Sequence, residues 1–132
     1  MMKSLLHSRN EAEYTSVAWH QSIRFERVSF AVRRPSLAQR IDLNGRVREL
    51  TLKHEFLKAG STSDQIEASL SELLVHKLYV EWGLAEIQGL KIDGNPADTE
   101  SLIERGPEGL IHEIVSAIKA ECGLTEDVRK NF

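Results

Sequence analysis

Residues 36–83 decide the fold, and they read SLAQRIDLNGRVRELTLKHEFLKAGSTSDQIEASLSELLVHKLYVEWG. Ser36 and Gln39 have the Ser-x-x-Gln spacing of a capping box, which marks the start of a helix. Gly60 supplies the stop that helices favour, and the segment Thr62–Gln65 repeats the capping-box spacing directly after it. The stretch therefore predicts two helices, and the short link between them predicts that they pair antiparallel.

Both predicted helices carry apolar residues at the three- and four-residue steps of a helical face. The first face holds Leu43, Val47, Leu50 and Leu57, widened by Ile41, Leu52 and Phe56; the second holds Ile66, Leu70, Leu73, Leu74, Leu78 and Trp82. Ser71 and Lys77 fall off the second face. Gly45 lies inside the first helix at a cost of about 1 kcal/mol relative to alanine, and a close helix crossing is the favoured explanation, with a kink as the second.

The segment before these helices has the alternation of strands. The apolar residues Val17, Trp19, Ile23 and Phe25 share one parity, and Val28, Phe30 and Val32 have the other, so the parity changes near Glu26-Arg27. Such a change indicates a tight turn or a bulge, so we expect a small β-hairpin that ends before Pro35. Residues 1–15 lack periodicity and are expected to be a mobile N-terminal tail.

The segment after these helices alternates short elements with turn residues. An extended segment near 89–93 runs into a turn, Asp98 or Thr99 caps a short helix that Gly106 stops, and Pro107 suits the first turn of the next. That next helix has an apolar face of Leu110, Ile111, Ile114, Val115, Ile118 and Cys122 and ends at Gly123, and a last short helix covers 126–130. The expected fold is mainly α (α+β), with four to five helices in a single domain over residues 16–132.

The composition is that of a small globular domain in a reducing compartment. The chain has 132 residues, of which 41% are hydrophobic and 28% charged. No apolar run approaches the roughly 18 residues of a membrane span, and no apolar region of a secretory signal follows the first residues. The single cysteine, Cys122, has no internal disulfide partner. We therefore expect a cytoplasmic protein that makes no contact with a membrane.

No motif in the chain assembles the chemistry of an enzyme. His54-Glu55 opens like a zinc-protease motif, but Lys58 stands where the second histidine ligand belongs. Asp93-Gly94-Asn95 lacks the later ligands of a calcium loop and is better interpreted as a turn. Cys122 lies on an apolar helical face, which favours a small buried hydrophobe over a nucleophile. We therefore expect no catalytic residue, no cofactor and no metal site.

The charge is distributed unevenly along the chain, whose net charge is −3. Residues 24–58 hold nine basic and four acidic side chains, whereas residues 59–132 hold six basic and fourteen acidic ones. The simpler interpretation is that folding sets the two segments side by side, so that each neutralises the other. The alternative is a polar partner or a second copy of the chain.

If the partner is a second copy of the chain, we expect a head-to-tail contact. The basic middle segment of one copy then binds the acidic C-terminal half of the next. The candidate contact residues are Arg40, Arg46, Arg48 and Lys53, facing Glu100, Glu104, Glu108 and Glu113. Trp82 is the candidate aromatic anchor, although its neighbours Tyr79 and Leu84 favour a position in the core.

Two stretches resemble a known family. The first runs from Arg33-Arg34-Pro35-Ser36 to Gly60. The second joins Glu81-Trp82-Gly83-Leu84, the segment GLKIDGNPA at 89–97, Leu102-Ile103, Gly106-Pro107-Glu108 and the tail Cys122-Gly123-Leu124-Thr125-Glu126. Together they cover about residues 28–131 and resemble the tail assembly chaperones of bacteriophages and prophages.

This resemblance implies a non-enzymatic protein of the host bacterial cytoplasm. Members of that family coat the long tape measure protein, keep its helices soluble and help to recruit tail tube subunits. Two other functions stay open: a structural virion or adaptor protein, and a nucleic-acid-binding regulator that uses the basic helix 36–58. Nucleic-acid binding is disfavoured because readers of this size are usually basic overall.

Overall fold

The structure is a computed structural model that describes residues 11–58 and 62–123, apart from the side chains of residues 54–64. Its elements in chain order are β1 (Val17–Gln21), β2 (Ser29–Arg33), α2 (Leu37–Lys58), α3 (Thr62–Gly83), β3 (Leu84–Gln88), β4 (Lys91–Ile92), β5 (Asn95–Pro96), α4 (Thr99–Arg105) and α5 (Glu108–Glu121). The mainly helical α+β class is confirmed. The predicted tail up to residue 10, the helix stop at Gly60, the second capping box and the helix 126–130 lie outside the described part.

Strands β1 and β2 form the predicted hairpin, with Val17 opposite Arg33 and Gln21 opposite Ser29. A third strand, β3, pairs antiparallel with β2, so the sheet has the order β1-β2-β3. The periodicity gave no sign of β3, because its sequence LAEIQ offers only two large apolar residues. Pairing with the central strand, rather than local preference, makes these residues a strand.

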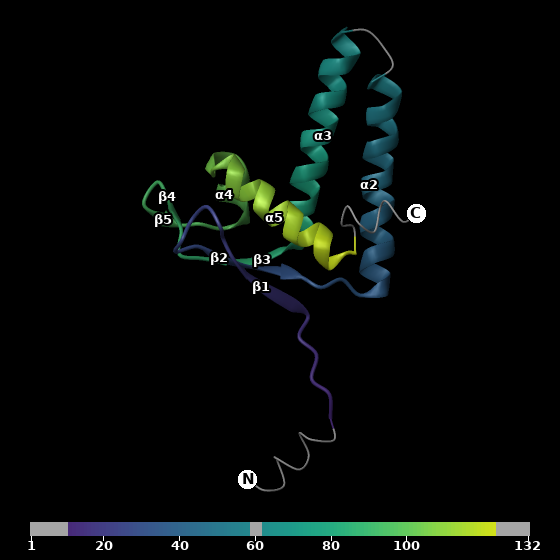
Figure 1. Cartoon of the computed structure of the whole chain (residues 1–132). Coiled ribbons are helices and arrows are strands. Elements are labelled where there is room, and N and C mark those ends of the chain that lie inside the picture. The colour runs from purple at the N-terminus through teal and green to yellow at the C-terminus, as the bar shows by residue number, and fades with distance from the viewer. Residues whose placement is uncertain (1–10, 59–61, 124–132) are drawn as a thin grey trace, which may run out of the picture.

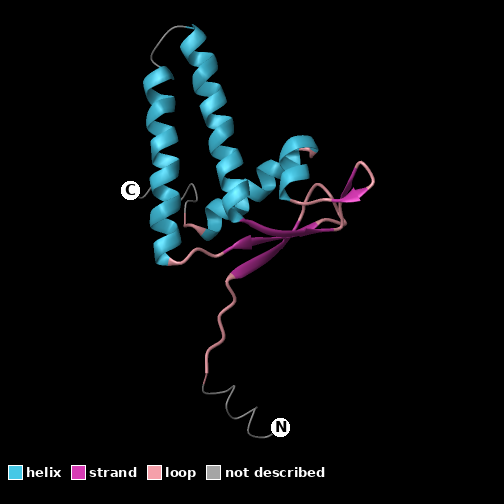
Figure 2. Cartoon of the chain, turned by 180° about the vertical axis from the view of Figure 1, so that it is seen from behind, coloured by secondary structure: helices cyan, strands magenta, loops and turns pink. Residues whose placement is uncertain are grey.

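Helices α2 and α3 form the predicted antiparallel pair, and both views show this pair rising away from the sheet and from α5 (Figures 1 and 2). The capping box at the start of α2 is present. The backbone N–H of Gln39 donates to Ser36 Oγ at 3.2 Å, and the N–H of Ser36 donates to Gln39 Oε1 at 3.0 Å. We call this projecting pair the hairpin arm.

The face of α3 that turns inward is not the one that the leucine spacing indicates. Ala68 and Ser71 are buried in the arm, although Ser71 was expected off the apolar face. Small side chains let two helices approach closely, and Ser71 Oγ donates to the Glu67 carbonyl at 3.1 Å, which satisfies the buried hydroxyl. Most of the leucine-rich face is consequently left towards solvent.

Gly45 does not serve a close helix crossing, and that prediction was wrong. A Cβ built at this position meets nothing within 4 Å, so the glycine lies on the outer side of α2.

Gly45→Ala should therefore stabilise the protein by up to about 1 kcal/mol, since alanine loses less backbone entropy in a helix. Urea unfolding followed by circular dichroism measures this change. An unchanged or lower midpoint would contradict an open position.

Helix α5 and the residues around it pack against the sheet and the lower end of the hairpin arm. Helix α5 lies across the sheet and against the foot of α3 (Figure 1), and its predicted apolar face is buried except at Ile111, which is half-buried. Pro107 is the N-cap of α5 rather than a residue of its first turn. Cys122 is a free, buried thiol whose pKa is raised by burial, as its place on the apolar face predicts. The core joins α5, the sheet and the lower halves of α2 and α3.

Candidate protein-interaction surface

A row of large apolar side chains is exposed along α3. Ile66, Leu70, Leu73 and Leu74 are 67%, 50%, 54% and 42% exposed, and we call these four residues the α3 stripe. They follow one another at helical steps that continue downward to Lys77, so the stripe lies on the side of α3 that faces α4. The sheet and α5 lie only at the foot of the arm, and the upper part of α3 projects beyond them (Figure 1), in agreement with the exposure of the stripe.

The stripe ends in two adjoining hollows at the angle between α3, α4 and α5. One, of about 460 Å³, lies between α3 and α4, and the other, of about 140 Å³, also reaches α5. We call them together the corner groove, which is lined by Leu73, His76, Lys77, Val80, Glu81, Thr99, Glu100, Ile103, Glu104, Glu108, Ile111 and His112. Leu73 belongs to both the stripe and the groove, so the two form one continuous surface.

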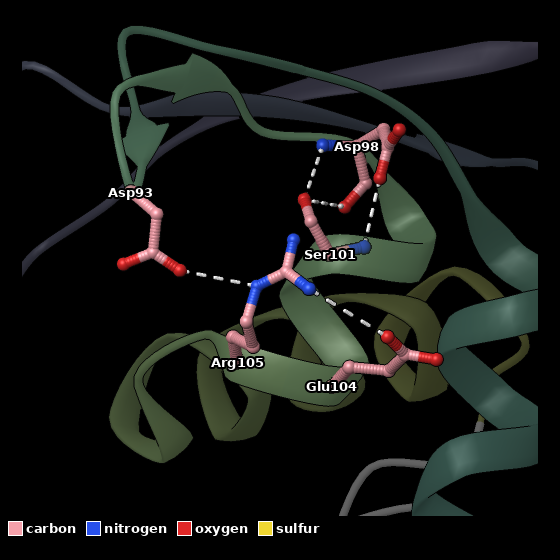
Figure 3. A network of polar contacts seen from close by, with 5 residues as sticks. All are labelled: Asp93, Asp98, Ser101, Glu104 and Arg105. Atoms are coloured by element: carbon pink, nitrogen blue, oxygen red, sulfur yellow. Dashed lines mark hydrogen bonds and ion pairs between the residues drawn. The ribbon is translucent and has the colours of Figure 1, made fainter.

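Local hydrogen bonds hold α4, which forms one wall of the groove (Figure 3). The Asp98 carboxylate accepts from the Ser101 N–H at 2.8 Å, and the Asp98 N–H donates to Ser101 Oγ at 3.0 Å. The hydrogen bond from the Ser101 backbone lowers the pKa of Asp98. At the other end of the helix, Arg105 lies 3.2 Å from Asp93 in the β4–β5 turn and 3.8 Å from Glu104.

Three of the four predicted acidic contact residues lie on this groove, namely Glu100, Glu104 and Glu108. The fourth, Glu113, is engaged inside the chain. Its carboxylate accepts from Ser22 Oγ at 2.8 Å and from the Ile23 N–H at 2.7 Å. Glu113 therefore ties α5 to the β1–β2 loop.

The predicted basic contact residues lie on α2. Arg40, Arg46, Arg48 and Lys53 are exposed, and Arg46 pairs with Asp42 at 3.1 Å. Among the described residues, no ion pair links α2 to α3, α4 or α5. The acidic and basic sets thus have no direct contact within the described chain, and the head-to-tail contact stays a prediction. Trp82 is half-buried and packs against the core.

Two histidines lie in the groove that sequence reasoning did not select. The rings of His76 and His112 meet edge to face, with centroids 5.5 Å apart. Burial lowers the pKa of His76 below its ordinary value of 6.5, and the charges of Lys119 and His112 lower it further, against the opposite effect of Glu72 and Glu108. Neutral His76 is thus favoured in the folded state.

Acidification should destabilise the fold through His76. Above pH 6.5 the imidazole of His76 is neutral in the folded and in the unfolded protein. As the pH falls below 6.5, the unfolded chain binds a proton at this residue before the folded protein does, because the pKa is lower in the folded protein. The free energy of unfolding therefore falls until the pH has passed the lowered pKa. His76→Gln should therefore lose less stability between pH 7.5 and 5.5 than the natural chain. Urea midpoints at the two pH values measure this. Equal losses in both proteins would show that His76 does not carry the effect.

This surface is built from exposed apolar side chains and carboxylates. In the part of the chain that the structure describes, no three His, Cys, Asp or Glu side chains converge to hold a metal ion. Within the same residues, no helix combines the length and the hydropathy needed to cross a bilayer. Comparison of the chain with protein-family models, with curated proteins and with solved structures finds no match. The fold and this surface are therefore the basis for a functional proposal.

Proposed function

We propose that this chain is a non-enzymatic polypeptide chaperone that covers an amphipathic helix of another protein. The observation that carries the proposal is the exposed α3 stripe on the projecting hairpin arm. The resemblance to phage tail assembly chaperones makes the tape measure protein the proposed partner and tail assembly the proposed process, with the tail tube protein recruited later.

Burial of the α3 stripe provides a binding free energy small enough for the partner to be released. Complete burial of a leucine or isoleucine contributes about 1.5–3 kcal/mol, so four side chains that are already about half covered would add roughly 4 kcal/mol in total. Association costs consume a large part of such a gain, so one stripe binds weakly. Several copies along one long helical partner would gain from multivalency. Contacts of this strength suit a protein that covers a partner during assembly and then leaves.

Coexpression with a long, helical, insoluble protein taken from the same gene neighbourhood tests the proposal. The natural chain should raise the soluble fraction of that partner several-fold, and the variant Leu70→Glu/Leu74→Glu should abolish the rescue. Ala38→Glu/Ala120→Glu adds the same charge at exposed helical positions off the stripe and should rescue normally. Circular dichroism confirms that both variants fold. Rescue by the stripe variant, or no rescue by the natural chain, would refute the proposal.

A second candidate is nucleic-acid binding through α2. It is favoured by one observation: Arg48 and Lys53 form no ion pair with any described residue. Binding of this kind would fall steeply with salt, because phosphate contacts release counterions. Retention on DNA that is lost in Arg48→Gln/Lys53→Gln would support it over the chaperone.

A further inference from the structure

We propose that the α3 stripe and the corner groove together receive a basic amphipathic helix, with apolar side chains on one face and Lys or Arg beside them. The inference rests on the proposed function and adds the chemical class of the partner. The observations that carry it are the apolar side chains of the stripe and of the smaller hollow, the carboxylates along the groove, and the length of the combined surface.

The smaller hollow of the groove has an apolar side and the volume of a single side chain. Leu73 and Val80 of α3, Ile103 of α4 and Ile111 of α5 line the hollow of about 140 Å³, and its other lining residues are polar: His76, Lys77, Glu108 and His112. A cavity of about 150 Å³ holds a group as large as benzene, so this hollow admits one leucine-sized or phenylalanine-sized group. One side chain of a partner can therefore bind in this hollow at the lower end of the surface, and further apolar side chains can pack against the α3 stripe above it.

The rim of the groove is acidic. Four carboxylates line it, those of Glu81, Glu100, Glu104 and Glu108, against the single ammonium of Lys77. Arg105 offsets part of this charge through its 3.8 Å contact with Glu104, but that pair is more than half exposed and is screened by water. An amphipathic helix with Lys or Arg beside its apolar face complements these carboxylates, whereas an amphipathic helix with Asp or Glu in those positions is repelled.

The length of the surface sets the length of the partner. Residues from Ile66 at the top of the stripe to Glu81 in the corner groove span about 22 Å at 1.5 Å per residue. A partner helix of four turns covers this distance, with apolar residues at the i, i+3, i+4 and i+7 steps.

The chain's own basic helix is a poor occupant. The outer side of α2 carries Leu37, Ile41 and Leu52, but Gly45 and Arg48 stand between the last two. Ile41 and Leu52 are therefore about 16 Å apart along the helix. Between them, this side of α2 has no apolar side chain that could enter the hollow of about 140 Å³ or pack against the α3 stripe. We therefore assign the surface to a segment of a different polypeptide.

Two fluorescein-labelled 18-residue helical peptides test the inference. Both carry leucine at the same positions, and the remaining positions are lysine in one and glutamate in the other. Fluorescence anisotropy should show that the lysine peptide binds the natural chain at least tenfold more tightly at low salt, and that the difference shrinks as salt rises. Leu70→Glu/Leu74→Glu should weaken its binding at least tenfold.

Matched variants locate the charge effect. Glu100→Gln/Glu104→Gln/Glu108→Gln should remove most of the preference for lysine, whereas Glu13→Gln/Glu26→Gln/Glu49→Gln, which changes the net charge equally at exposed positions elsewhere, should keep it. If both triple variants reduce the preference alike, the rim is not the site, and the inference fails.

The remaining outcomes separate this inference from the proposed function. Equal binding of both peptides that the stripe variant abolishes would overturn the charge preference and leave the chaperone proposal standing. Binding of neither peptide would contradict both. A concentration-dependent dimer in sedimentation velocity that the Glu100/Glu104/Glu108 variant abolishes would make a second copy the occupant and overturn the assignment to a different polypeptide.

Discussion

Gly89→Ala should lower the free energy of unfolding by about 3 kcal/mol or more, a large part of the 5–15 kcal/mol that holds a domain of this size together. Gly89 follows β3 with φ +83°, and a Cβ there would collide with the backbone carbonyl oxygen of Arg27. A backbone atom cannot turn aside as a side chain can, so the substitution must push β3 away from the β1–β2 loop.

Gly94→Ala is the matched control for this prediction. Gly94 has nearly the same backbone angle, φ +85°, in the Asp93-Gly94 turn between β4 and β5, but its Cβ would meet nothing within 4 Å. It should therefore pay only the strain of the left-handed conformation, about 1–2 kcal/mol. Urea midpoints of the two variants give the difference. Equal losses would mean that the collision at Gly89 relaxes without cost.

Leu102→Ala should cost about 3 kcal/mol, while Leu70→Ala should cost less than about 1 kcal/mol. Leu102 of α4 is 0% exposed within the core, so its removal leaves a cavity. Leu70 is 50% exposed on the α3 stripe, so its removal leaves no enclosed space, and alanine is itself the better helix former.

The comparison of these two leucines tests whether the stripe belongs to the fold. Thermal and urea unfolding of both variants measure the difference, with Leu70→Ala expected to keep its helical circular dichroism signal. A loss at Leu70 as large as that at Leu102 would show that the stripe is covered within the chain. In that case the stripe could not be offered to a partner.

Sequence reasoning located part of the candidate surface. The excess of acidic residues after position 59 selected Glu100, Glu104 and Glu108, which lie on the groove, but it also selected Glu113, which serves the β1–β2 loop. It missed Ile103, Ile111 and the histidine pair, because each of these is unremarkable within its own helix. They form a site only where three helices converge.

The features that depend on near neighbours could be predicted from the amino-acid sequence: the capping box at Ser36, a helix cap at Asp98 or Thr99, the β1–β2 hairpin, the Asp93-Gly94 turn and the apolar face of α5. The pairing of β3 with the sheet depends on the tertiary structure, and so does the orientation of α3, which buries Ala68 and Ser71 and exposes the leucines of the α3 stripe. The physical reason is that periodicity reports which side of a helix is apolar, whereas burial depends on what stands beside it. Here the base of the fold is too small to cover the full length of the arm.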